Sequence, residues 1–477
     1  MSWRGSLDRF KRPVTESGKT SNCAQRAPLP CLAGVWRRIT RCSVPLITGV
    51  GCQEDSAGLQ SAFTRRSPKP WPPSRTRRRS THCTRRWWIL LVLVGAKVYR
   101  SPTHPPLADG VVVIRNGRIA DVGARSEVTV PPSARVLDCT GLTLTSGFWN
   151  SHVHFVEPKW ADATAAPPDR LARQLTEMLT RYGFTTVVDT GSPWTEASAL
   201  RRRVASGEID GPRILSAGEI LSAAGGLTPP VLQRLGLLPG TAIEVTSREQ
   251  GIEQVRRHVS KGVDAVKIYA ATTMQTAVEM PPDILAAVVR EAHQNGKLAL
   301  AHPHNLRGLQ NAIAGGVDVL VHTMPNAGPL TGEQIAAMTG KRMSLIPTLK
   351  LWTVEGAKEG MPANIAERFV GVAVGQLRAY AGAGGQILFG TDVGYIDYDP
   401  TDEYVLMQRG GMTFSAILDS LTTSPAARFA MSERTGRVLV GMDADLTVLD
   451  ADPAADIKAF ATVRYVLRAG RIIYQSD

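Results

Sequence analysis

The sequence predicts an α/β protein, namely a (β/α)8 TIM barrel with a small β-sandwich domain formed by segments from both ends of the chain. Two observations support this prediction. Between residues 147 and 431, strand-like apolar runs alternate with amphipathic helical stretches, which is typical of a barrel of parallel strands. On either side of this region, short β-branched runs and turns dominate, and two such flanking segments most simply pair with each other.

Eight apolar runs are the expected barrel strands. They cover residues 147–154, 184–189, 213–217, 265–270, 298–302, 317–322, 344–349 and 387–392. The amphipathic stretches predict helices over residues 170–182, 281–295, 307–314, 365–381 and, as the last helix, 414–431. Pro281 and Pro282 open one of these helices and Gly296 closes it, as helix-end preferences require. Residues 219–248, rich in Gly and Pro, are expected as a long connection after the third strand.

The flanking segments set the domain boundaries. We assign residues 87–146 and 432–477 to the β-sandwich and residues 147–431 to the barrel. In the first segment, two β runs on either side of Asn116-Gly117 predict a hairpin. In the last segment, residues 441–474 predict a strand followed by a second hairpin.

Residues 1–86 carry the basic character of the chain. The formal net charge is +13, yet this segment alone holds 18 Lys and Arg against 4 Asp and Glu, and the remainder is nearly neutral. It is rich in Pro, Ser and Arg without a sustained period, so we expect a disordered extension. Five of the six cysteines lie here without a Cys-x-x-Cys pair, so no zinc ribbon is indicated. We favour a translation start further along the chain over a nucleic-acid-binding tail, and expect no nucleic acid partner.

Residues 87–96 form an apolar run that follows Arg85 and Arg86. A bilayer core needs about 20 apolar residues, so we expect no membrane span. The run is either the apolar core of a secretion signal, if the true start is nearby, or a buried β-strand, and we favour the strand. We therefore expect a cytoplasmic protein, or an exported one if residues 85–96 are a signal segment.

Metal-binding residue types stand at the ends of the expected strands. His152 and His154 close the first strand, and because residues i and i+2 share one face of a strand, both imidazoles point to the same side. The C-terminal ends of barrel strands converge, so side chains at these ends surround one point. A single histidine at such an end is usually structural, but six residues together predict a metal site. They are His152, His154, Lys267, His302, His322 and Asp392.

Short motifs surround these six residues. They are Gly147-Phe148-Trp149-Asn150-Ser151-His152-Val153-His154, Val266-Lys267-Ile268, Ala301-His302, Val321-His322 and Gly390-Thr391-Asp392. Together they resemble the amidohydrolase superfamily, and most closely its branch of imidazolonepropionase-like and prolidase-like enzymes. The pattern after Ser424 is also similar to the C-terminal pattern of that family, so the resemblance covers about residues 88–477.

The resemblance implies a binuclear centre that holds two divalent metal ions, with zinc as the expected metal. His152, His154 and Asp392 would hold the first ion, and His302 and His322 the second.

Lys267 would bridge the two ions as a carbamate formed with CO2. A lysine ammonium cannot ligate a cation, whereas its CO2 adduct is an anion with two oxygens. The alternative is an unmodified Lys267 and a single metal ion.

Some residues near the motifs depart from the family pattern. Ser146, Asn150 and Ser424 stand where the family usually has Pro, Asp and Asn, and none of the three is a ligand. His304 could compete with His302 as a ligand, but Ala301-His302 matches the family position.

We therefore expect His304 to meet the substrate, together with Tyr269 and Tyr395. The partner is expected to be a small-molecule substrate, and relatives commonly assemble as homo-oligomers.

The expected function is a metal-dependent hydrolase that cleaves an amide or another C–N bond, with dipeptidase-like or cyclic amide substrates as possibilities. A metal-activated hydroxide would attack, and Asp392 would shuttle the proton. The alternative is a deaminase of the same superfamily, although Asn305 stands where such deaminases usually have a glutamate. A further alternative is a non-catalytic family member that acts in binding or assembly.

Overall fold

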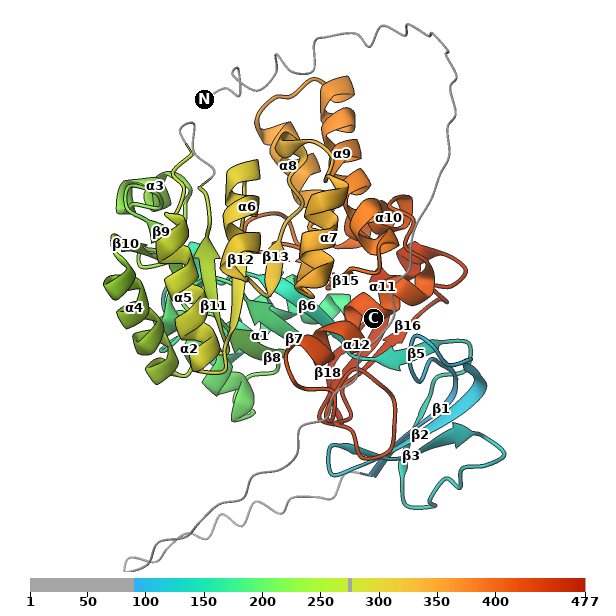
Figure 1. Cartoon of the computed structure of the whole chain (residues 1–477). Coiled ribbons are helices and arrows are strands. Elements are labelled where there is room, and N and C mark those ends of the chain that lie inside the picture. The colour runs from blue at the N-terminus through green and yellow to red at the C-terminus, as the bar shows by residue number, and fades with distance from the viewer. Residues whose placement is uncertain (1–89, 273–276, 477) are drawn as a thin grey trace, which may run out of the picture. The chain divides into compact units, whose positions relative to one another are not determined.

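The computed structural model describes residues 90–272 and 277–476 (Figure 1). The predictions for residues 1–86 and for 87–89 lie outside these described residues. Within the described ranges, no helix is both long and apolar enough to cross a membrane.

Strands are present at all eight expected places and their pairings are parallel, but the eighth, expected over residues 387–392, covers only Gln386 and Ile387. The strands are β6 (Phe148–Val153), β7 (Phe184–Asp189), β8 (Arg213–Ser216), β11 (Ala265–Tyr269), β12 (Leu298–His302), β13 (Val319–Val321), β14 (Ser344–Ile346) and β15 (Gln386–Ile387). Strands β6, β7 and β8 form one sheet, and β11 to β15 belong to a second. Backbone hydrogen bonds join the sheets at both edges, from Ser151 N to Phe389 O (2.7 Å) and from Asp264 N to Ser216 O (2.8 Å).

Helices alternate with these strands along the chain, as Figure 1 shows for the green to orange part. The molecule is therefore of the α/β class. The helices are α1 (Pro168–Met178), α2 (Trp194–Ala205), α4 (Arg248–Lys261), α5 (Pro282–Gln294), α6 (Leu306–Gly315), α7 (Gly332–Gly340), α8 (Leu349–Lys358), α9 (Ala363–Gly382) and α10 (Thr401–Arg409).

The expected last helix, residues 414–431, is instead two short helices, α11 (Phe414–Leu421) and α12 (Thr423–Arg428). A proline inside a helix removes one hydrogen bond and its ring clashes with the carbonyl four residues before. For Pro425 that residue is Leu421, where α11 ends. The prediction of one continuous helix was wrong because it did not consider this proline.

The long connection over residues 219–248 contains regular structure that the sequence analysis did not predict. It holds β9 (Ile220–Ala223), α3 (Pro229–Arg234) and β10 (Ala242–Val245). Strand β9 pairs with both β10 and β11 and so extends the second sheet. The glycines and prolines of this connection lie between the two short strands, which is why the strands were overlooked.

Both ends of the described chain contribute to one sheet, as expected. Its strands are β1 (Leu90–Val98), β2 (Leu107–Arg115), β3 (Arg118–Ala124), β4 (Arg135–Asp138), β5 (Thr143–Ser146), β16 (Leu446–Leu449), β17 (Val463–Arg468) and β18 (Arg471–Gln475). The order is β18-β17-β16-β5-β1-β2-β3, with β4 beside β1. The join between the two ends is the antiparallel pair of β5 and β16. The expected hairpin turns at Asn116 and Gly117, which both have positive φ.

An apolar cluster fills the space that the parallel strands share. Its members come from β11, β12, β13 and β14 and from the residues next to β8 and β15. They are Ala217, Ala265, Leu300, Val319, Val321, Ile346 and Leu388, all buried. Lys267 and His302 stand two residues after Ala265 and Leu300, on the same face of their strands. The strands therefore carry these two polar side chains at the C-terminal end of the apolar cluster.

A buried ion pair links β8 to the segment that leads into β16. Arg213 reaches Asp443 Oδ2 at 3.0 Å and Asp445 Oδ2 at 2.9 Å, and the Asp445 side chain is only 2% exposed. Removing one partner of a buried pair leaves a buried charge uncompensated. We expect Arg213→Met to lower the free energy of unfolding by about 3 kcal/mol, measured by urea denaturation.

Arg434 provides the matched control. It also contacts Asp443, at 2.7 Å, but its side chain is 54% exposed. Because solvent screens exposed pairs, Arg434→Met is expected to cost less than about 1 kcal/mol. Equal losses for the two variants would contradict the prediction.

Candidate metal centre

The six predicted ligands meet at the C-terminal ends of the parallel strands. His152 lies in β6, Lys267 in β11, and His302 ends β12. The other three follow strands directly or within a few residues. They are His154 after β6, His322 after β13 and Asp392 after β15. All six side chains are buried.

Three of these side chains place their ligand atoms in a tight triangle. His152 Nε2 and His154 Nε2 are 3.0 Å apart. Asp392 Oδ1 lies 2.9 Å from His152 Nε2 and 3.1 Å from His154 Nε2. Atoms that bind one zinc ion at about 2.0–2.1 Å lie roughly 2.9–3.3 Å from one another at angles between 90° and the tetrahedral angle. The triangle therefore has the dimensions of one metal's ligand set.

His322 and His302 extend this group. The ligand atoms of His152, His322 and Asp392 all lie within 4.8 Å of one another. The His322 ring is 4.8 Å from the His152 ring and 4.6 Å from the His302 ring. Within the part of the chain that the structure describes, both ring nitrogens of His302 lack a hydrogen-bond partner. A buried polar atom without a partner is costly, and a metal ion would satisfy it.

Lys267 lies in the same buried group. Its side chain is fully buried, and its Nζ is 5.7 Å from the centre of the Tyr269 ring. Among the described residues, this Nζ has no hydrogen-bond partner. Burial lowers the pKa of Lys267 to about 7, against a smaller opposing effect of Asp392. A considerable fraction of this lysine is therefore neutral near neutral pH.

Burial also keeps His152, His302 and His322 neutral. Burial lowers the pKa of His322 to about 3. It lowers the pKa of His152 and of His302 well below the usual range, and the nearby Lys267 lowers both further. For Asp392, burial raises the pKa, but His152 and hydrogen bonds from His152 and His154 outweigh it and hold the pKa low. Neutral imidazoles beside an ionised carboxylate are the protonation states that bind a divalent metal.

The backbone is strained at several of these strand ends. His322, Asp392, His304 and Thr348 all have positive φ, at 74°, 65°, 50° and 43°. Residues with a Cβ rarely adopt this conformation, and such strain concentrates at functional sites. Strict alternation along β13 would place the His322 ring on the opposite face from Val321. The positive φ at His322 instead turns this ring toward His302.

Further residues that the sequence analysis missed orient two of the histidines. Gly191 O lies 2.8 Å from His154 Nδ1, and Asp189 holds this turn through the Gly191 N–H at 3.3 Å. Thr348 Oγ1 lies 2.6 Å from His322 Nδ1. Partners of this kind fix the tautomer, so that the opposite nitrogen is free to bind metal. In the sequence, these partners could have been found as polar residues at the ends of the second and seventh expected strands.

Asn150 ties the first expected strand to the eighth. Its Oδ1 accepts hydrogen bonds from the backbone N–H groups of His152 and Thr391, both at 3.2 Å, and its Nδ2 donates to Thr391 Oγ1 at 2.7 Å. We expect Asn150→Leu to lower the free energy of unfolding by about 2–4 kcal/mol, because two buried N–H groups lose their acceptor. Urea denaturation at a fixed zinc concentration measures this change.

Asn150→Asp is the control for this prediction. It keeps an acceptor oxygen at the same position and should lose less stability than Asn150→Leu. If both variants are equally stable, the hydrogen bonds of Asn150 do not hold the two segments together.

The three predicted substrate residues lie at different places around the group. The Tyr269 ring stacks on the His302 ring, with the ring centres 4.3 Å apart. The His304 ring also stacks on the His302 ring, with the centres 5.8 Å apart. Tyr395 follows Asp392 closely, and its backbone N–H donates to Asp392 O at 3.1 Å. Burial raises the pKa of both tyrosines, so their hydroxyls stay protonated.

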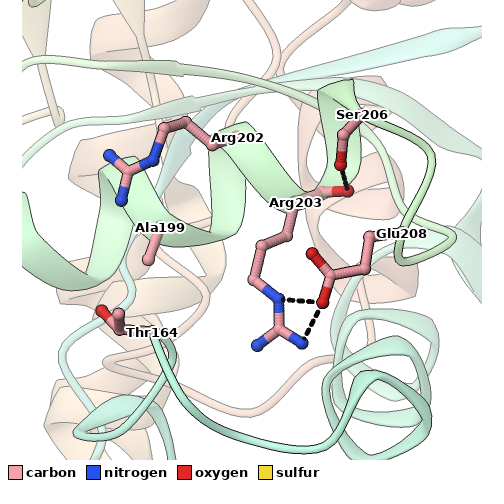
Figure 2. A pocket seen from close by; sticks show the side chains of 6 residues that line it. All are labelled: Thr164, Ala199, Arg202, Arg203, Ser206 and Glu208. Carbon is pink, nitrogen blue, oxygen red and sulfur yellow. Dashed lines mark hydrogen bonds and ion pairs between the residues drawn. The ribbon is translucent and has the colours of Figure 1, made fainter. Parts of the chain in front are cut away.

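A separate cavity of about 340 Å³ lies beside α2 (Figure 2). Its lining residues include Arg202, Arg203 and Glu208 and none of the six predicted ligands. The Arg203 guanidinium binds Glu208 Oε1 at 2.6 Å and the carbonyl oxygens of Ala163 and Ala166. Because Arg203 is engaged in these bonds, its role at this cavity is structural.

Comparisons with known proteins show the family of this chain. The model of the amidohydrolase family matches residues 143–473. An ochratoxinase from Aspergillus niger is 26% identical over 412 residues, which cover 77% of this chain and 83% of that enzyme.

Solved structures of similar fold include a prolidase complexed with N-methylphosphonate-L-proline (TM-score 0.66, 27% identity, 81% of this chain and 100% of that one). A Xaa-Pro dipeptidase with bound methionine has a TM-score of 0.69 at 22% identity, again over 81% and 100% of the two chains. Because the family model covers more than half of the sequence, the chain belongs to the amidohydrolase family and is a hydrolase that acts on carbon–nitrogen bonds.

Proposed function

We propose that this protein is a binuclear metal-dependent amidohydrolase. In this proposal, residues 147–431 close into a (β/α)8 barrel, and residues 87–146 and 432–477 form a β-sandwich beside it. The backbone hydrogen bonds between β6 and the segment after β15 support the closure. The shared sheet of β5 and β16 supports the second domain.

The triangle of His152 Nε2, His154 Nε2 and Asp392 Oδ1 carries the proposal. These residues would hold the first metal ion, and His302 and His322 the second. The residues fit such ions, because His302 and Lys267 otherwise bury polar atoms that have no partner among the described residues. Zinc is the expected metal, since imidazole and carboxylate ligands suit it.

Lys267 would bridge the two ions as a carbamate. Its neutral amine would attack the carbon of CO2: a C–N bond forms, one C=O electron pair moves to oxygen, and the nitrogen loses its proton to a water molecule. The product is an anion with two oxygens. A pKa lowered to about 7 favours this reaction, because only the neutral amine is nucleophilic.

When bound, the two metal ions would supply an activated water and would polarise the carbonyl of the scissile bond. Asp392 performs the proton transfers: its carboxylate accepts a proton from the attacking water and returns it to the leaving nitrogen as the C–N bond breaks. The low pKa of Asp392 supports this order, because the residue begins as a base. His304 and Tyr269, stacked around His302, would contact the substrate.

The substrate class is an amide or another C–N compound, either dipeptide-like or a cyclic amide. The similarity to an ochratoxinase and to prolidases supports small amides. The deaminase alternative is weakened by Asn305, whose side chain caps α6 by accepting the Gly308 N–H at 2.7 Å. A non-catalytic role is disfavoured because all six ligand positions are filled.

Metal content per chain tests the proposal. Elemental analysis of the purified protein should find close to two metal ions, and Lys267→Ala should reduce this number to one or less, because the bridge between the ions is lost. Addition of bicarbonate should raise the occupancy of the second metal ion in the parent protein and not in the Lys267→Ala variant.

Other outcomes would contradict it. About one metal in both proteins would mean that Lys267 is not a bridge. A folded parent without metal would overturn the proposed mechanism altogether.

A further inference from the structure

The N-terminus of α8 has an unusual cap. Thr348 precedes the helix with φ 43° and ψ 52°, a left-handed conformation, whereas capping threonines are normally extended. Its hydroxyl is used elsewhere. It donates to Pro347 O at 2.9 Å and lies 2.6 Å from His322 Nδ1.

These two contacts fix the tautomer of His322. A hydroxyl has one proton, and Thr348 donates it to Pro347 O, so His322 Nδ1 must be the donor in the other bond. The Nε2 atom then keeps its lone pair. Thr348 in its left-handed conformation therefore presents His322 as a metal ligand through Nε2.

Glu403, on α10, takes over the capping that Thr348 does not provide. Its Oε2 accepts the backbone N–H of Lys350 at 2.8 Å. The Glu403 side chain is completely buried. The first N–H groups of a helix need such an acceptor, so Glu403 acts as a cap from 53 residues away.

A second contact holds the same helix turn. Lys350 Nζ donates to Asp399 O at 2.5 Å and pairs with the Asp397 carboxylate. Residues 397–399 follow Asp392 in the chain. The first turn of α8 is thus fixed against both the His322 side and the segment that carries Asp392.

We infer that Glu403 is a positioning residue for His322, and that it acts by leaving the Thr348 hydroxyl free to bind the imidazole. Without the Glu403 carboxyl group, the N–H group of Lys350 needs another acceptor. The nearest one in sequence is Thr348 Oγ1, once Thr348 relaxes to the extended conformation of an ordinary cap. That change would remove the partner of His322 Nδ1.

The inference rests on the proposed function, because it takes His322 as a ligand. Zinc titration of the full chain, followed by calorimetry and elemental analysis, provides the test. We expect Glu403→Ala to weaken zinc binding at the His322 site by 10- to 100-fold, the usual effect of losing the partner of a ligand. Glu403→Gln should stay within about threefold of the parent, because it keeps an acceptor oxygen. Burial already raises the pKa of Glu403 to about 7, so a neutral side chain is tolerated there.

The double variant separates positioning from general destabilisation. Thr348→Val removes the hydroxyl with little change in shape and should weaken zinc binding as much as Glu403→Ala. If Glu403 acts through Thr348, adding Glu403→Ala to Thr348→Val should cause no further loss. Cobalt substitution gives a second readout, since loss of one imidazole ligand changes the visible absorption of the bound Co²⁺.

Thr331→Val is the matched control. Thr331 caps α7 through the Gln334 N–H, and no ligand contacts it in the described structure. This variant should lose stability and bind zinc like the parent. Suppose the parent protein binds two ions. Unchanged zinc binding in Glu403→Ala, or fully additive losses in the double variant, would then overturn the inference and leave the proposed function standing. A parent that binds no zinc would overturn the proposed function and this inference with it.

Discussion

Asp392→Asn is expected to lower kcat by about 10,000-fold, at the upper end of what general acid–base catalysis contributes. Asparagine has the same shape and keeps an oxygen at the Oδ1 position, which lies 2.9 Å from His152 Nε2 and 3.1 Å from His154 Nε2. It cannot accept a proton from water or donate one to a leaving nitrogen. The loss should therefore fall on kcat, with KM changed much less. Steady-state kinetics on an amide substrate found by screening measure it.

Two controls accompany this variant. Metal content must remain close to that of the parent, so that the effect is not one of metal loss. Asp402→Asn changes an exposed carboxylate ten residues further along and should leave kcat within about twofold. If Asp392→Asn keeps its metal and retains more than about a tenth of the parental kcat, Asp392 is not the proton shuttle.

The sequence was sufficient to predict much of this site because the side-chain period of a strand is two. In Leu298–His302, the residues Leu300 and His302 share a face, so a buried leucine places the histidine at the end of the same apolar interior. The same reasoning applies to Ala265 and Lys267. Parallel strands then bring their C-terminal ends together, so residues distant in sequence become neighbours.

Other features depend on tertiary structure and could not be predicted. Alternation along β13 gives the wrong face for His322, and only the positive φ at this residue turns its ring toward His302. The partner of its Nδ1, Thr348, is likewise in a left-handed conformation that no propensity favours for a β-branched residue. Glu403 lies on a helix that the sequence analysis did not predict. These arrangements follow from packing around the site.

Removal of metal should have the second large effect. Dialysis against a chelator is expected to abolish amide hydrolysis, and zinc should restore it. Because a ligand that binds only the folded state stabilises it, the free energy of unfolding should fall by about 4 kcal/mol relative to protein held at 1,000 times its Kd for zinc. Thermal or urea denaturation with and without chelator measures this difference.

His302→Phe sharpens the metal prediction, because its effect on stability should change sign with metal. In metal-free protein, both ring nitrogens of His302 are buried without a partner in the described structure, and phenylalanine removes this cost while it keeps the ring that stacks on Tyr269. The variant should then be about 1–2 kcal/mol more stable than the metal-free parent. With zinc present it should be the less stable protein, since it has lost a ligand. His293→Phe, at a half-exposed histidine paired with Asp318, should respond to the chelator like the parent. If His302→Phe is destabilising to the same extent in both conditions, His302 contributes packing and does not bind metal.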